Sequence, residues 1–98
     1  MAGLAGQKYG FTDDNVSRAP EGEGVYQIER GDGAIIYIGS GKIRERLQSH
    51  RRKADGVTDA CIFRNSPVNY RREECANCRA VEQRMLSTTP TLCNQRIG

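Results

Sequence analysis

Residues 24–41 read GVYQIERGDGAIIYIGSG and carry the clearest structural pattern of the chain. This stretch contains two β-prone segments, 24–30 and 34–39, on either side of Gly31-Asp32-Gly33. An Asp-Gly step favours the tight turn that joins two antiparallel strands. The sequence therefore predicts a β-hairpin here.

The position of the turn decides which residues of the hairpin face each other. A loop at residues 31 and 32 places Tyr26 opposite Tyr37, whereas a loop at residues 32 and 33 places Tyr26 opposite Gly39. Side chains alternate between the two faces of a strand, so the two tyrosines share one face in either register. Such a pair is commonly an aromatic packing contact, and its position alone does not indicate chemistry.

The segment after the hairpin, residues 42–53, has the spacing of a short helix. Its side chains fall on two sides, with Ile43 and Leu47 on one and Lys42, Arg46 and His50 on the other. Arg46 and His50 are four residues apart and so project together. A guanidinium can bind phosphate oxygens and an imidazole can exchange a proton, so this pair suits a phosphodiester, although a lone histidine among basic residues is more often ordinary surface.

The charge of the chain is concentrated in this helical segment. Residues 42–53 carry a net charge of +5, whereas residues 1–41 carry −3 and residues 54–98 carry +1. One basic segment in an otherwise balanced protein indicates either a contact with a polyanion such as nucleic acid or a solvated helix face.

The remaining segments complete a small α+β domain. Residues 58–64 are predicted to form a third strand, which Asn65-Ser66-Pro67 ends, and residues 70–86 a longer helix. Residues 1–23 are rich in Gly, Asp and Glu and are expected to be an irregular N-terminal arm before a domain at 24–98. The predicted architecture is a small three-stranded antiparallel sheet flanked by helices in the order β-β-α-β-α.

Length and composition restrict the class of protein. The 98 residues are 37% hydrophobic and 28% charged, which fits one small globular domain rather than two domains or a disordered chain. No apolar run approaches the ~20 residues of a membrane-spanning helix, and the first residues lack the features of a signal peptide. We expect a soluble, cytoplasmic protein with no membrane partner.

The four cysteines, Cys61, Cys75, Cys78 and Cys93, allow three interpretations. Disulfides are not favoured in a reducing cytosol. Cys75-Ala-Asn-Cys78 has the spacing of zinc ligands, but no second Cys-x-x-Cys follows it. Small buried thiols are the favoured interpretation.

The predicted helix at 70–86 places one carboxylate on its apolar side. Its apolar arc consists of Cys75, Cys78, Val81, Met85 and Leu86. Glu82 falls within this arc. An inward carboxylate is costly unless it is paired or holds a metal, so Glu82 is either a functional residue or the partner of a base such as Arg46.

Together these residues resemble a known family of nucleases. Gly24-Val25-Tyr26 and Tyr37-Ile38-Gly39, eleven residues later, look like the paired motif of the GIY-YIG nucleases. Arg46 with His50 resembles the helix motif of that family, Glu82 its metal-binding carboxylate, and Asn94 after Pro90 its C-terminal asparagine. The resemblance extends over residues 24–96.

The resemblance implies an endonuclease that hydrolyses DNA phosphodiesters by in-line attack of water, with a single Mg²⁺ or Mn²⁺ on Glu82. The implied catalytic residues are Tyr26, Tyr37, Arg46, His50, Glu82 and Asn94. Arg46 and Tyr37 would contact the phosphate, and Tyr26 would be the base, which requires positive charge from Arg46, Lys42 or the metal to favour the phenolate. His50 would relay the proton, and Asn94 would position Glu82 or the substrate.

Further residues are expected to bind the substrate without reacting: Gly39, Lys42, Arg51, Arg52 and Lys53. Gly39 would let the phosphate approach the end of the strand. No additional DNA-recognition domain is evident, so targeting would depend on this domain, a homodimer or a separate protein, in a process such as repair or recombination. Two other classes stay open: a nucleic-acid-binding module without catalysis, and a small zinc-stabilised interaction domain.

Overall fold

The computed structural model describes residue 4, residues 6–54 and residues 56–94. It is an α+β structure whose single sheet has four strands, all pairing antiparallel in the order β1-β4-β2-β3. The strands are β1 (Tyr9–Gly10), β2 (Glu23–Arg30), β3 (Ile35–Lys42) and β4 (Pro67–Glu74). The antiparallel α+β class is therefore confirmed, with one more strand than the sequence predicts and with β3 at an edge.

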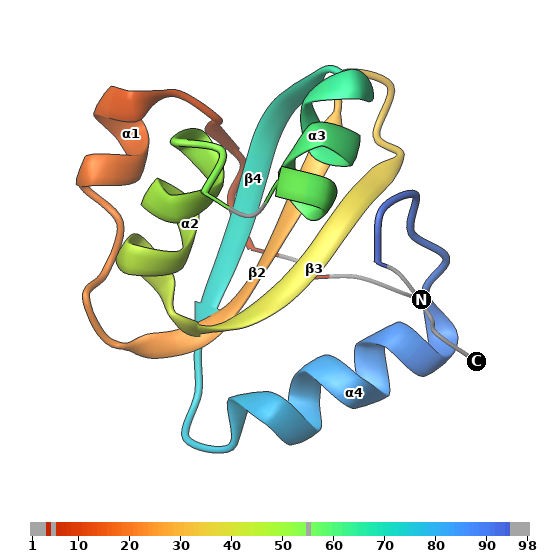
Figure 1. The fold of residues 1–98 in the computed structure, drawn as a ribbon. Helices are drawn as coiled ribbons and strands as arrows, with labels where there is room; N and C mark the ends of the chain where they lie inside the picture. Colours follow the sequence, from red (N-terminus) through yellow and green to blue (C-terminus); the bar gives the residue numbers. More distant parts are fainter. Residues whose placement is uncertain (1–3, 5, 55, 95–98) are drawn as a thin grey trace.

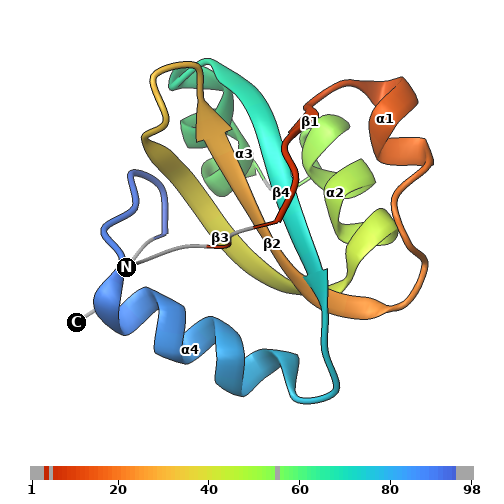
Figure 2. The ribbon, with the colours of Figure 1, turned by 180° about the vertical axis from the view of Figure 1, so that it is seen from behind.

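The helices lie on both sides of this sheet. They are α1 (Asp13–Ser17), α2 (Ile43–Arg51), α3 (Gly56–Arg64) and α4 (Cys78–Thr88). Helices α1, α2 and α3 cover one face, as Figures 1 and 2 show from opposite sides. Helix α4 packs separately against β2 and β3. The edge strand β3 therefore runs between α2 and α4.

The main hydrophobic core lies between the sheet and the first three helices. Its fully buried members include Val16, Tyr26, Ile28, Ile36, Ile43, Leu47, Ile62 and Tyr70. The α2 segment thus buries the apolar side that its spacing predicts. His50 is only 2% exposed, so it is not the ordinary surface histidine that is common among basic residues.

The hairpin forms as predicted, and its register resolves the two alternatives. Tyr26 pairs with Gly39, and Ile28 pairs with Tyr37. The loop spans residues 31–33, with Gly33 at a φ of 93° that favours glycine. A register shift after Ile28 is a β-bulge of one residue. The shared face of the tyrosines is confirmed, because the ring centroids of Tyr26 and Tyr37 are 6.3 Å apart.

The strand predicted at residues 58–64 is wrong, because this segment belongs to helix α3. Asp59 and Ile62 are its buried residues and are three positions apart, as one face of a helix requires. A short apolar run has no period that separates a strand from a buried helix, so the sequence pattern was ambiguous here.

The single helix predicted at residues 70–86 is also wrong. Residues 67–74 form β4, a central strand between β1 and β2, and the helix begins only at Cys78. The many charged side chains of this segment are not typical of a central strand. One of them, Arg71, is paired within the sheet, because its Nε donates a hydrogen bond of 2.8 Å to Oε2 of the buried Glu29. Pairing with β2 therefore overrides the helical pattern.

Within the predicted N-terminal arm, residues 6–23 do not form the irregular structure that their composition suggests, whereas residues 1–3 and 5 lie outside the described part of the chain. They contain β1 and α1, and Phe11, Val16 and Ala19 are buried in the core. Thr12 caps α1, because its hydroxyl accepts a hydrogen bond of 3.2 Å from the backbone N–H of Asn15. The ring of Tyr9 stacks on that of Tyr70 at 5.5 Å between centroids. The ordered domain therefore begins before residue 24.

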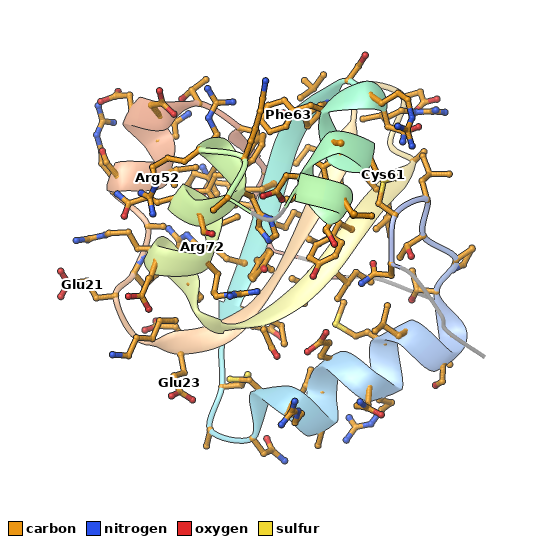
Figure 3. The ribbon with its side chains drawn as sticks, in the orientation of Figure 1. Glu21, Glu23, Arg52, Cys61, Phe63 and Arg72 are labelled. Carbon is orange, nitrogen blue, oxygen red and sulfur yellow. A yellow bond between two sulfur atoms is a disulfide. The ribbon has the colours of Figure 1, made fainter. Side chains whose placement is uncertain are left out.

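The cysteines divide into two pairs. Cys61 of α3 and Cys93 form a disulfide, so the expectation of four thiols is wrong for these two (Figure 3). Cys75 and Cys78 are free, with their sulfur atoms 2.7 Å apart. Burial, together with Cys78, raises the pKa of Cys75 to about 11, so its thiol is protonated at neutral pH.

None of the helices in the described part of the chain combines the length and the apolar character needed to cross a membrane.

Candidate active site

A pocket of about 540 Å³ lies along the edge strand β3, between α2 and α4. The residues of β3 that line it are Tyr37, Gly39, Ser40 and Gly41. Arg46 comes from α2, residues 78–80 and Glu82 come from α4, and residues 76–77 come from the segment just before that helix. Three of the predicted catalytic side chains, Tyr37, Arg46 and Glu82, therefore meet in one depression although they are up to 45 positions apart in sequence.

Glu82 reaches this pocket from α4. It is partly buried, and its Oε1 accepts a hydrogen bond from the hydroxyl of Ser40 on β3. The helical arc that led to Glu82 counted residues before Cys78 as helical, which they are not. Glu82 nevertheless faces the sheet edge, because it lies one turn into α4 on the side that packs against β3.

Arg46 enters the pocket from the first turns of α2. Gly41 lies beside it, with a backbone φ of 127°. A Cβ at residue 41 would be 3.2 Å from Cγ of Arg46. A side chain there would be strained and would crowd the arginine, so the glycine allows Arg46 to lie along the end of β3.

Tyr26 and His50 form a buried hydrogen-bonded pair between the sheet and helix α2. The Tyr26 hydroxyl lies 2.8 Å from Nε2 of His50, and the side chain of Tyr26 is fully buried. The other ring nitrogen of His50, Nδ1, lies 2.5 Å from Oδ1 of Asp59 on α3. Asp59 is a residue that the sequence analysis missed, because the segment was interpreted as a strand. In the sequence, Asp59 lies nine residues after His50, and this spacing does not indicate a contact. The two side chains meet only because the chain turns between α2 and α3.

Gly39 lies directly beside the Tyr26 hydroxyl at the wall of the pocket. A Cβ at residue 39 would be 2.3 Å from that hydroxyl oxygen, a distance that no side chain could keep. Tyr26 therefore depends on the missing side chain of Gly39, which itself lines the pocket. This gives Gly39 a steric role in placing a tyrosine, beside the predicted role of admitting a phosphate.

The surroundings of Tyr26 hold its phenol in the protonated form. Burial raises the pKa of Tyr26 well above its ordinary value, and the neighbouring Tyr37 and Glu82 add to this rise. The charge and the hydrogen bond of Arg46 lower the pKa but are outweighed. Arg46 thus acts in the direction that the base role of Tyr26 requires, but burial has the larger effect, so that role stays a prediction.

Asn94 holds the C-terminal segment against β3. Its side chain accepts a hydrogen bond of 2.8 Å from the backbone N–H of Ile38 and donates one of 2.8 Å to the carbonyl of the same residue. Cys93 continues this pairing with a hydrogen bond of 2.8 Å from its N–H to the carbonyl of Ile36. Asn94 thus supports the edge strand, and its predicted role in positioning Glu82 or the substrate stays a prediction.

The basic residues at the other end of α2 lie away from this pocket. Arg51 pairs with Asp13 at 2.8 Å and lies over the ring of Phe11. Lys53 lies over the ring of Phe63 at 4.8 Å. Arg52, labelled in Figure 3, lines a second, smaller depression together with residues of α1. Lys42 is exposed at the start of α2 and lines a third one. The structure does not bring these four residues to the main pocket.

Comparison with known families places this chain in one of them. The model of the family described as a domain of unknown function, DUF7508, matches residues 4–88, and the chain belongs to that family. The match includes β1 and α1 as well as the residues of the pocket. No curated protein and no solved structure gave a significant match.

Proposed function

We propose that this chain is a metal-dependent endonuclease of the GIY-YIG type that hydrolyses phosphodiester bonds of DNA. The observation that carries the proposal is the pocket at the edge of β3, where Tyr37, Arg46 and Glu82 converge beside the buried Tyr26–His50 pair. A guanidinium, a phenol and a carboxylate around one depression provide the groups that a phosphodiester and its counterion need.

The donor groups of the pocket fit one divalent cation. Mg²⁺ usually retains several waters and takes one or two protein carboxylates together with substrate phosphates. Glu82 offers one carboxylate, with the Ser40 hydroxyl hydrogen-bonded to it. No group of three or more His, Cys, Asp or Glu that could hold a metal occurs within residues 4, 6–54 and 56–94. A site of this kind therefore depends on the substrate for further oxygen ligands.

The side chains divide the chemistry among them. Glu82 would hold the Mg²⁺ or Mn²⁺, which would supply neutralisation of the charge on the phosphate. Arg46 grips a nonbridging phosphate oxygen, and the Tyr37 hydroxyl donates a hydrogen bond to the same group. Both residues line the pocket, so they can reach a phosphate seated there.

Tyr26 and His50 move the proton of the attacking water. The water oxygen forms a bond to phosphorus as the bond from phosphorus to the 3′ oxygen breaks. The proton of the water passes to the Tyr26 oxygen, while the phenolic proton passes to His50 Nε2 over the 2.8 Å hydrogen bond. The leaving oxygen takes a proton from solvent. Because the phenol transfers its own proton in the same step, no stable phenolate is required at neutral pH.

The test is cleavage of supercoiled plasmid and of a branched DNA with Mg²⁺ or Mn²⁺. Cleavage that needs the metal and is lost in Glu82→Ala supports the proposal. Glu45→Ala is the matched control, because Glu45 is an exposed carboxylate on α2 outside the main pocket. Equal cleavage by the wild type and Glu82→Ala would remove Glu82 from the mechanism.

A nucleic-acid-binding module without catalysis is the second candidate. It is favoured by the full burial and raised pKa of Tyr26, which oppose a basic phenol. Salt-sensitive DNA binding by both the wild type and Glu82→Ala, with no cleavage by either, would support this alternative. The zinc-stabilised domain has less support, because Cys61 and Cys93 are joined in a disulfide and cannot act as thiolate ligands.

A further inference from the structure

Helix α3 buries a carboxylate against the only histidine of the chain. Asp59 is 0% exposed and His50 is 2% exposed. A buried carboxylate is costly unless hydrogen bonds compensate for the lost water. Oδ1 of Asp59 lies 2.5 Å from Nδ1 of His50, so the two atoms are hydrogen-bonded. The fold therefore brings α3 and α2 together through two polar side chains in an otherwise apolar core.

The chemistry of this contact determines which nitrogen of the ring carries the hydrogen. An ionised carboxylate only accepts hydrogen bonds, so Nδ1 of His50 must be the donor. Nε2 is then an acceptor in the neutral ring, and the group next to it is the Tyr26 hydroxyl at 2.8 Å. The opposite tautomer would turn a lone pair of Nδ1 toward the carboxylate. The three residues thus form one directed chain, from Tyr26 through His50 to Asp59.

The aromatic neighbours of His50 keep the ring in this orientation. The His50 ring packs edge-on against Tyr37 at 5.1 Å between centroids, and the ring of Tyr26 is 5.6 Å away. A ring held between two tyrosines cannot turn to exchange its nitrogens without moving one of them. Packing and the carboxylate therefore select the same arrangement.

We propose that Asp59 is a positioning residue that holds His50 in the tautomer with hydrogen on Nδ1, so that Nε2 can accept the phenolic proton of Tyr26. The consequence for cleavage rests on the proposed function, whereas the tautomer itself does not. In serine proteases the analogous aspartate orients a histidine in the same way, and its replacement by asparagine lowers kcat by about 10⁴-fold because the ring adopts the wrong tautomer.

The test is nitrogen-15 NMR of the histidine ring in the neutral state. The chain has one histidine, so the ring signals belong to His50 without further assignment. We expect the wild type to show a protonated Nδ1 and an unprotonated Nε2. In Asp59→Asn we expect loss of this preference. Asp14→Asn is the matched control, because Asp14 is an exposed aspartate on α1, and it leaves the ring signals unchanged.

A wild-type ring with hydrogen on Nε2, or on both nitrogens, would overturn the proposal. So would a folded Asp59→Asn variant whose ring keeps the wild-type tautomer. If the variant does not fold, the wild-type spectrum still decides the question. In the cleavage assay, a folded Asp59→Asn variant should lose activity by about 10²-fold to 10⁴-fold while its affinity for DNA stays within about twofold. An inactive wild type would refute the nuclease, while the spectra would still decide the role of Asp59.

Discussion

Tyr26 and Gly39 face each other across the β2–β3 pair, and the hydroxyl of the tyrosine occupies the space that a side chain at residue 39 would need. A Cβ there would lie 2.3 Å from the hydroxyl oxygen and 2.5 Å from the carbon that bears it. This relationship links the glycine of one strand to the placement of the tyrosine, and through it to His50.

Gly39→Ala should therefore destabilise the protein by about 1–3 kcal/mol, because an extra methyl group in a packed region displaces the surrounding side chains. Urea unfolding measures the change. Gly31→Ala is the matched control: a Cβ there would be 3.6 Å from a side-chain carbon of Val68, an ordinary contact, so its effect should be below about 1 kcal/mol. Equal effects of the two substitutions would contradict the steric role of Gly39.

Tyr26→Phe should lower cleavage of plasmid DNA by about 10²-fold to 10⁴-fold, because the hydroxyl that passes a proton to His50 is removed. Affinity for DNA should change little, since the Tyr26 side chain is fully buried and makes no surface contact. Single-turnover cleavage and filter binding measure the two quantities. Tyr9→Phe serves as the control because Tyr9 lies on β1. Unchanged turnover in Tyr26→Phe would exclude the residue from the mechanism.

The alkaline stability of the protein should depend on Tyr26. Its pKa is raised in the folded state above the unfolded value of about 10, so the folded protein retains a proton that the unfolded chain loses. The contribution of Tyr26 to the free energy of unfolding is therefore complete below about pH 10, and it is lost as the pH rises further. Tyr70 and Cys75 have raised pKa values and act in the same direction.

The comparison of wild type with Tyr26→Phe isolates this effect. Above about pH 10, the free energy of unfolding of the wild type should fall more steeply with pH than that of the variant. Urea unfolding at a series of pH values measures both slopes. Parallel curves would show that the pKa of Tyr26 is the same in the folded and unfolded states.

Removal of the disulfide should destabilise the protein. Cys61 and Cys93 are 32 positions apart, and the loop-entropy relation gives about 3–4 kcal/mol for a crosslink of that span. The double variant Cys61→Ser with Cys93→Ser should lose this amount in urea unfolding. Cys75→Ser is the control, because Cys75 is a free thiol. Under reducing conditions the wild type should approach the double variant, and a loss below about 1 kcal/mol would show that the crosslink contributes little.

Local patterns accounted for the parts of the fold that depend on neighbours in sequence. The hairpin followed from its Asp-Gly turn, and the apolar side of α2 from the spacing of Ile43 and Leu47. The secondary structure predicted for residues 58–74 is wrong because it depends on distant partners. Helix α3 packs against the core, and β4 pairs with a strand on each side.

The same division applies to the candidate site. The sequence pattern indicated Tyr37, Arg46 and Glu82, which line one pocket. It also assigned linked roles to Tyr26 and His50, whose side chains are hydrogen-bonded. It also suggested that Lys42, Arg51, Arg52 and Lys53 lie near the substrate. A run of basic residues does not show which of its members pair with other side chains, as Arg51 does with Asp13 and Lys53 with the ring of Phe63. Asp59 was missed because only the packing of α3 brings it to His50.

Local patterns thus specify the turn, the alternation of side chains along β2 and β3, and the helical period of α2. Contacts between distant segments specify the pairing of β4 in the middle of the sheet, the disulfide from α3 to the C-terminal segment, and the hydrogen-bonded chain from Tyr26 to Asp59. These features cannot be read from local patterns because each is stabilised by contacts between residues that are far apart in sequence. A buried carboxylate or a charged central strand is stable only when its partner has been brought to it.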